Sequence, residues 1–244
     1  DVKKENRVMT LTLNRPEALN AANNAAYSGI RNGLLEAESD SSIAVVVVTG
    51  TGRAFCAGQD LGEMNSRNSG GDPEPSQFPS MLKALTHFRK PVIAAVNGIG
   101  VGIGMTFLSH CDLVLMASSA RLRTPFPQLG LAPEAGSSYT FAHVMGWQNA
   151  AYTLMSGRWF TAQECLDMGL VWRVCEPDLL MDDTYAIAQE LAANPIPSLV
   201  ATKELMLAAG RASQTIDAHE RENTAYASLL GGPANEEALK AFME

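Results

Sequence analysis

The stretch KPVIAAVNGIGVGIGMTFLSH, residues 90–110, decides the fold predicted for this chain. Residues Val92–Val96 form a short, uncharged, β-branched run closed by an Asn-Gly pair, which is typical of a buried strand. Glycine then occupies every second position from 98 to 104, and the apolar pattern that resumes at Met105 suits a buried helix. Such a turn brings bare backbone N–H groups against a ligand oxygen, with the positive end of the helix dipole behind them. Without a ligand, the same residues form only a tight turn between two buried elements.

An earlier stretch repeats this arrangement. Residues 43–48 are the plainest strand in the chain, and their run of four valines indicates that both faces are buried. They lead into TGTG at 49–52 and RAFCAGQDL at 53–61. If this turn and the one at 96–104 converge, one N–H from each can hold a single oxyanion. A dinucleotide site is excluded by spacing, because GxGxxG counted from Gly98 requires glycine at the position of Ile103.

Strands alternate with helices as far as residue 175, and only helices follow. The expected extended segments are 7–14, 43–48, 92–96, 111–116, 122–126 and 171–175. The expected helices are 19–38 with Asn20 as its cap, 81–88, 137–147, 149–155, 161–168 capped by Thr161, 178–193, 196–209, 213–230 and 235–242. Residues 66–77 are rich in Gly, Pro and Ser and predict a loop that moves. This order predicts an α/β core followed by a small helical segment.

The composition narrows the class of protein. The 244 residues are 46% hydrophobic and 18% charged, which fits one large ordered domain. A net charge of −8 argues against a nucleic-acid partner. The four cysteines lie far apart without metal spacing, so free thiols in a reducing compartment are expected. No apolar run has the length of a membrane span and no signal peptide opens the chain, so we expect no membrane partner. The last residues, Phe242-Met243-Glu244, are not a peroxisomal tripeptide, so we expect a bacterial cytoplasmic protein.

Three motifs in order resemble the crotonase family, also called the enoyl-CoA hydratase/isomerase superfamily: NRPEALNA at 14–21, GRAFCAGQDL at 52–61 and AVNGIGVGIG at 95–104. The resemblance implies the α/β crotonase (ClpP-like) spiral of repeated ββα units over residues 1–194. It also implies a helical segment over 195–244 that packs a homotrimer or a dimer of trimers. The implied ligand is acyl-CoA in fatty acid metabolism, with no separate cofactor and no metal.

By motif matching, the resemblance assigns the oxyanion-hole N–H groups to Ala57 and Ile103. It implies that the following residues line the substrate: Ala57, Gly58, Gln59, Asp60, Leu61, Gly102, Ile103 and Phe126. The resemblance is incomplete at two positions, because family hydratases carry glutamates where this chain has Thr106 and Phe126. Hydration requires water to be oriented and deprotonated on one side of the double bond while the other carbon is protonated. We therefore expect poor hydratase activity or none.

One acidic residue, Glu134, remains in the stretch TPFPQLGLAPEAGSSYTF at 124–141. This stretch resembles the peroxisomal-type delta-3, delta-2 enoyl-CoA isomerases, whose single catalytic glutamate occupies the matching place. The resemblance implies that Glu134 moves a proton from the alpha to the gamma carbon while an apolar wall containing Phe126 keeps water out. The alternative without catalysis is a solvated first-turn charge at a helix start.

The sequence is also compatible with three other functions. They are a hydratase, another acyl-CoA enzyme of this scaffold such as an aroyl-CoA dehalogenase, and a CoA-binding module without catalysis. The four histidines, His87, His110, His143 and His219, lie on separate elements and are expected to be structural or on the surface. Asp60 is expected to hold its own loop. Lys203 and Arg211 could meet CoA phosphates, but we expect them to be solvated.

Overall fold

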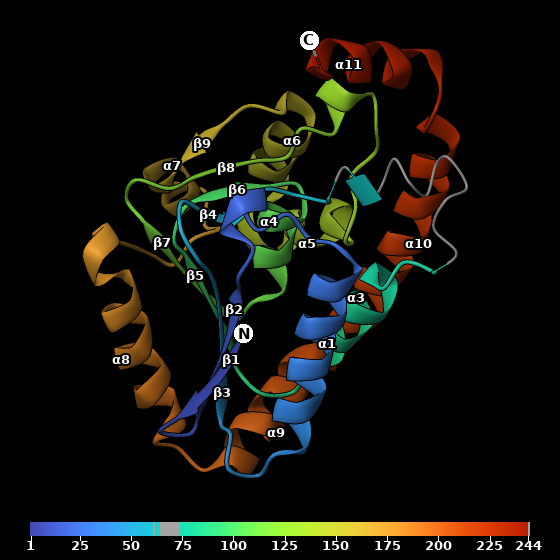
Figure 1. Ribbon diagram of the computed structural model, residues 1–244. Coiled ribbons are helices and arrows are strands. Elements are labelled where there is room, and N and C mark those ends of the chain that lie inside the picture. The colour runs from blue at the N-terminus through green and yellow to red at the C-terminus, as the bar shows by residue number, and fades with distance from the viewer. Residues whose placement is uncertain (61, 64–73, 244) are drawn as a thin grey trace.

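The computed structural model of the chain describes residues 1–60, 62–63 and 74–243 (Figure 1). Among these residues the larger sheet has six strands in the order β1-β2-β3-β5-β7-β10. Its first strands, β1 (Val2–Glu5) and β2 (Val8–Leu13), pair antiparallel, and every later pairing in this sheet is parallel. The later strands are β3 (Val45–Gly50), β5 (Val92–Val96), β7 (Leu113–Ala117) and β10 (Arg173–Cys175).

A second sheet has the order β4-β6-β8-β9 within the described residues. Its strands are β4 (Ala54–Cys56), β6 (Ile99–Val101), β8 (Arg121–Arg123) and β9 (Phe160–Thr161). Each of β3, β5 and β7 in the larger sheet is followed directly by β4, β6 or β8 in the smaller one, and then by helix. This repeated strand–strand–helix order confirms the predicted spiral. Because the repeats are parallel, their strand-to-strand turns lie at the same edge of the core.

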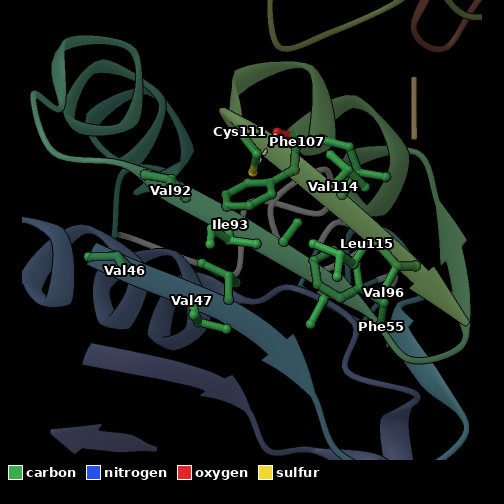
Figure 2. Close-up of a cluster of buried hydrophobic side chains, with 14 of the residues drawn as sticks. Val46, Val47, Phe55, Val92, Ile93, Val96, Phe107, Cys111, Val114 and Leu115 are labelled. Carbon is green, nitrogen blue, oxygen red and sulfur yellow. Dashed lines mark hydrogen bonds between the residues drawn. The ribbon is translucent and has the colours of Figure 1, made fainter. Parts of the chain in front are cut away.

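The valine-rich strands are buried on both faces, as their sequence predicted. Figure 2 shows Val47, Ile93 and Leu115 of three neighbouring strands packed with Phe55 and Phe107. Helix α8 (Leu180–Ala192) contacts β2, β3, β5 and β7 and covers one face of the large sheet (Figure 1). The helices α1 (Asn24–Ser39) and α3 (Phe78–His87) pack together on the other side.

The middle of the chain supplies short helices near the smaller sheet. They are α4 (Ile103–Thr106), the 3-10 turn η2 (Phe107–His110), α5 (Ser137–Met145), α6 (Trp147–Ser156) and α7 (Ala162–Asp167). Thr161 caps α7, and its hydroxyl and the Glu164 carboxylate each accept the other's backbone N–H, so the predicted cap is confirmed. Two further 3-10 turns, Pro127–Leu129 and Pro177–Leu179, precede α5 and α8.

The chain ends in three helices, α9 (Ile196–Leu207), α10 (Arg211–Leu229) and α11 (Pro233–Met243). Helix α10 lies beside α3 and contacts α3, α5 and α9 (Figure 1). A buried ammonium group anchors α9, because Lys203 Nζ donates to the carbonyl of Lys90 at 2.8 Å and to Asp112 Oδ2 at 2.7 Å. Lys203 is 7% exposed, so the expectation that it is solvated at the surface is wrong. No helix in the described ranges is long and apolar enough to cross a membrane.

Two expectations from the sequence were wrong at the N-terminal end. The first helix begins at Asn24 rather than residue 19, because Asn23 is the cap and its side chain accepts the N–H of Ala26. Asn20 instead has a left-handed φ of 57°, and its amide donates to the carbonyls of Thr51 and Ala54. Strand β1 was not predicted. The loop predicted at 66–77 lies outside the described residues as far as residue 73.

Candidate active site

The two strand-to-glycine turns converge, as predicted. A Cβ on Gly104 would overlap the backbone carbonyl of Cys56, and one on Gly58 would lie 3.3 Å from the carbonyl oxygen of Val101. Gly58 also has a φ of 106°, a conformation that L side chains rarely adopt. Glycine at 58 and 104 therefore lets the backbone of the first turn lie directly against the backbone of the second.

In the first turn, the N–H of Ala57 already has an acceptor. It donates to the carbonyl of Leu19 at 3.0 Å, which conflicts with the assignment of this group as an oxyanion donor. The residues flanking Gln59 bond to Ala22, through the Gly58 carbonyl at 2.7 Å and the Asp60 N–H at 3.0 Å. In such a parallel bridge the N–H of the central residue faces away from the partner, and that of Gln59 has no acceptor among the described residues.

In the second turn, Gly102 starts α4 with a φ of 53°. Its N–H donates to Arg123, and its carbonyl accepts the N–H groups of Met105 and Thr106. Ile103 is the first residue of the helix, where a backbone N–H has no intrahelical acceptor. Within the described part of the chain its N–H has no other acceptor either, so Ile103 is free to donate to a ligand.

Glu134 lies in a tight turn just before α5. Ala135 and Gly136 both have left-handed φ angles, 62° and 70°, and the Glu134 carbonyl accepts both the N–H and the hydroxyl of Ser137. This turn directs the half-buried Glu134 side chain to α4, where Thr106 Oγ1 donates to Glu134 Oε1 at 2.6 Å. Thus the threonine at the position of a family hydratase glutamate bonds directly to the remaining carboxylate.

Burial raises the pKa of Glu134 to about 8, with the charge of Glu222 acting in the same direction and the Thr106 hydroxyl opposing both. A carboxyl group with this pKa can take up and release a proton near neutral pH, which general acid–base catalysis requires. Two further groups lie within electrostatic reach. Burial is the main cause that raises the pKa of Cys56 to about 11 and raises that of Tyr226, and the charge of Glu134 adds to both.

A half-buried histidine and a buried glutamate hold the Glu134 turn from outside. His110 Nε2 lies 2.8 Å from the Ala135 carbonyl, and since a carbonyl only accepts, this nitrogen carries the hydrogen. Burial lowers the pKa of His110 to about 4, which keeps the ring neutral. Glu222 of α10 accepts the Gly136 N–H at 2.6 Å and the Ser138 N–H at 2.7 Å. Neither role was predictable from the sequence, because both residues are distant along the chain from the turn.

The other candidate residues that the structure describes bond or pack within the protein. Asp60 Oδ1 accepts the N–H groups of Gly62 and Glu63, and Oδ2 pairs with Arg15 at 3.0 Å, so its expected loop-holding role is confirmed. Arg211 donates to the carbonyl of Ser109 at 2.6 Å rather than being free in solvent. Phe126 is buried with 6% of its surface exposed. Leu61 lies outside the described residues, and the described residues include no cluster of three potential metal ligands.

Comparison with known proteins gives the family. The family model described as enoyl-CoA hydratase/isomerase matches residues 3–244, so the chain belongs to that family of acyl-CoA enzymes. The chain is 33% identical to the 1,2-epoxyphenylacetyl-CoA isomerase of Escherichia coli K12, over 98% of this chain and 93% of that protein. It is 34% identical to the 2,3-dehydroadipyl-CoA hydratase of the same strain, over 100% and 94%.

Solved structures agree with this assignment. An enoyl-CoA hydratase/isomerase from Pseudoalteromonas atlantica T6c superposes with a TM-score of 0.93 at 34% identity, covering 100% of this chain and 96% of that one. The enoyl-CoA hydratase EchA8_6 from Mycobacterium marinum is 51% identical, with a TM-score of 0.80 over 85% of this chain and 98% of that one. The relatives include proteins named as isomerases and as hydratases.

Proposed function

We propose that the protein is a delta-3, delta-2 enoyl-CoA isomerase. The observation that carries this proposal is the Glu134 carboxylate, which has a pKa of about 8 and accepts the hydroxyl of Thr106 from the short helix that follows the second glycine turn. In this reaction Glu134 removes one proton from the alpha carbon of a 3-enoyl-CoA and leaves an enolate. The resulting carboxylic acid returns one proton to the gamma carbon, and the double bond moves into conjugation with the thioester.

The developing enolate oxygen needs preorganised donors. We assign them to the backbone N–H groups of Gln59 and Ile103, since Ala57 already bonds to Leu19. Both donors lie on converging turns at the ends of buried strands, so they need little reorganisation during the reaction. Coenzyme A enters as part of the substrate along the loop from Ala57 to Asp60.

A hydratase is the second candidate, and it is favoured by the name of the 51% identical Mycobacterium marinum protein. Hydration by this family's pattern uses a second carboxylate to activate water. Within the described residues, Glu222 is the buried glutamate whose charge acts on Glu134, and both of its oxygens accept backbone N–H groups. Thr106 and Phe126 supply no carboxylate either, so the site favours return of a proton over addition of water.

Self-association through the C-terminal helices is part of the same proposal. Leu205 and Met206 of α9 are 76% and 61% exposed, and Leu229 of α10 is 43% exposed. Apolar side chains gathered on a helical segment need cover, and a second copy of the chain provides it. A trimer is the simplest such assembly.

The test supplies 3-enoyl-CoA and 2-enoyl-CoA side by side and follows the ultraviolet absorbance of the conjugated thioester. Absorbance gained from the 3-enoyl substrate, with little lost from the 2-enoyl substrate, supports the isomerase. Glu134→Gln should remove the isomerisation by ~100- to ~10,000-fold while the fold and CoA binding remain, because an amide cannot accept the alpha proton. Asp60→Asn is the control and should lose far less. Faster hydration than isomerisation by the unaltered protein, or near-normal turnover by Glu134→Gln, would overturn the proposal.

A further inference from the structure

We propose that Glu222 is a positioning residue for Glu134: it fixes the turn that carries the base and places a negative charge opposite it. This inference rests on the proposed function, in which Glu134 moves the proton. Glu222 belongs to α10, far along the chain from the turn, and is 5% exposed. Each of its carboxylate oxygens accepts one backbone N–H group: Oε2 accepts that of Gly136, and Oε1 accepts that of Ser138.

A helix cap alone explains these bonds only in part. Helix α5 has Gly136 at its cap position, which supplies no side-chain acceptor, so its first N–H groups require one from elsewhere. A serine or asparagine at the cap would meet that need without burying a charge. The turn instead lies against the α10 backbone, because a Cβ on Gly136 would lie 2.8 Å from the Thr215 carbonyl oxygen. Burying a carboxylate to cap a helix is energetically unfavourable. Here the same buried charge also raises the pKa of Glu134.

Among the described residues, Glu222 is the one whose charge acts on Glu134. Glu134 accepts the Thr106 hydroxyl of α4, and its charge also acts on the Cys56 thiol of β4 and the Tyr226 phenol of α10. Burial raises the pKa of both Cys56 and Tyr226, so the thiol and the phenol are neutral at neutral pH, as is the His110 ring beside Ala135. Burial raises the pKa of Glu222 too, but the N–H groups that it accepts favour its ionised form.

Glu222 therefore affects Glu134 in two separate ways, through its hydrogen bonds to the turn and through its charge. The two hydrogen bonds hold the left-handed turn at Ala135 and Gly136, and so determine where the Glu134 carboxyl lies relative to the substrate. The like charge disfavours ionisation of Glu134 and keeps its proton exchange near neutral pH. A residue that only stabilised the fold would affect neither the position of the acid limb of the rate profile nor its response to charge.

The test measures the pH dependence of kcat/KM for Glu222→Gln, with Glu220→Gln as the matched control on the exposed face of the same helix. The acid limb of the unaltered protein should lie near pH 8. In Glu222→Gln the limb should move to lower pH, because the like charge is gone. Its plateau should fall by about 10- to 100-fold, because the amide group offers one acceptor for two donors and loosens the turn. Glu220→Gln should retain both the limb and the plateau.

Glu222→Asp separates the effect of the hydrogen bonds from the effect of the charge. It also provides the test if Glu222→Gln does not fold. The shorter side chain keeps the charge but cannot reach both N–H groups, so its plateau should fall while its limb stays in place. An unmoved limb in a folded Glu222→Gln protein, or an undiminished plateau in Glu222→Asp, would overturn the inference. Glu134→Gln distinguishes this failure from failure of the proposed function: if that variant turns over normally, Glu134 is not the base, whatever Glu222 does.

Discussion

Replacement of Glu134 by glutamine should stabilise the folded protein in alkaline solution, independently of any substrate. The carboxyl group has a pKa of about 8 in the folded chain, against about 4.3 when unfolded. Because the folded value is the higher one, folding favours the protonated group. The resulting stability is fully present below about pH 4, and is lost as the pH rises through 8. Glutamine has almost the same shape, carries no charge and does not titrate.

The magnitude follows from the gap between the two pKa values. Each pH unit is worth about 1.4 kcal/mol, so full shielding would give roughly 5 kcal/mol. Glu134 is half-buried, and partial access of water reduces the expected difference to roughly 2–4 kcal/mol. The lowering of the pKa by the Thr106 hydroxyl is already contained in the value of about 8, so it does not reduce this difference further.

The assay is urea unfolding of both proteins at pH 5 and at pH 9, at equal protein concentration so that any assembly contributes equally. The unfolding free energy of Glu134→Gln relative to the unaltered protein should increase from pH 5 to pH 9. The other titrating groups cancel in this difference. Glu220→Gln, at an exposed site, should show no such increase. A Glu134→Gln difference that is the same at both pH values would contradict this prediction, because it would mean that Glu134 is ionised in the folded protein at pH 5.

Three further outcomes are expected. Thr106→Val removes a hydrogen bond from the ionised form of Glu134, so the acid limb should move to higher pH and kcat/KM at pH 7 should fall by about 10-fold; an unmoved limb would contradict the bond. Ile103→Pro removes one proposed oxyanion donor at a first helical position, where proline is well tolerated, and should lower kcat by about 100-fold or more. Ile103→Ala keeps the donor and should stay within a few-fold, whereas equal losses in both variants would exclude a backbone role. Light scattering should show an assembly at micromolar concentration that Leu205→Glu weakens, and a stable monomer before substitution would disprove self-association.

The framework of the fold was predictable because its signals are local. A run of four valines can be buried on both faces only in a central strand, and β3 lies where that run is. The start of α1 was not predictable, since Asn20 and Asn23 are equally good caps by type. The choice between them depends on contacts from Asn20 to the backbone at Thr51 and Ala54, which lie far along the chain.

The site was predictable to a similar extent. A motif match identified Glu134, and the glycine spacing identified turns that do converge. Motif and spacing could not predict which backbone N–H of the first turn is the proposed oxyanion donor. In an extended loop, neighbouring N–H groups face opposite sides, and the bridge to Ala22 determines which side Gln59 faces. Glu222 gave no sequence signal, because an isolated glutamate on an amphipathic helix is usually a solvated charge.

The two halves of the site are therefore built in different ways. The proposed donors lie at the ends of buried parallel strands, where the sheet itself fixes the backbone. Glu134 lies on a turn whose Ala135 has a left-handed φ of 62°, which is unfavourable by roughly 1–2 kcal/mol for a residue with a Cβ. The hydrogen bond from His110 and the two hydrogen bonds to Glu222 offset that strain. Glu222 belongs to α10, one of the C-terminal helices. Docking of α10 is consequently part of forming the base, because without it the N–H groups of Gly136 and Ser138 lose their acceptor and the turn loses one of its two outer supports.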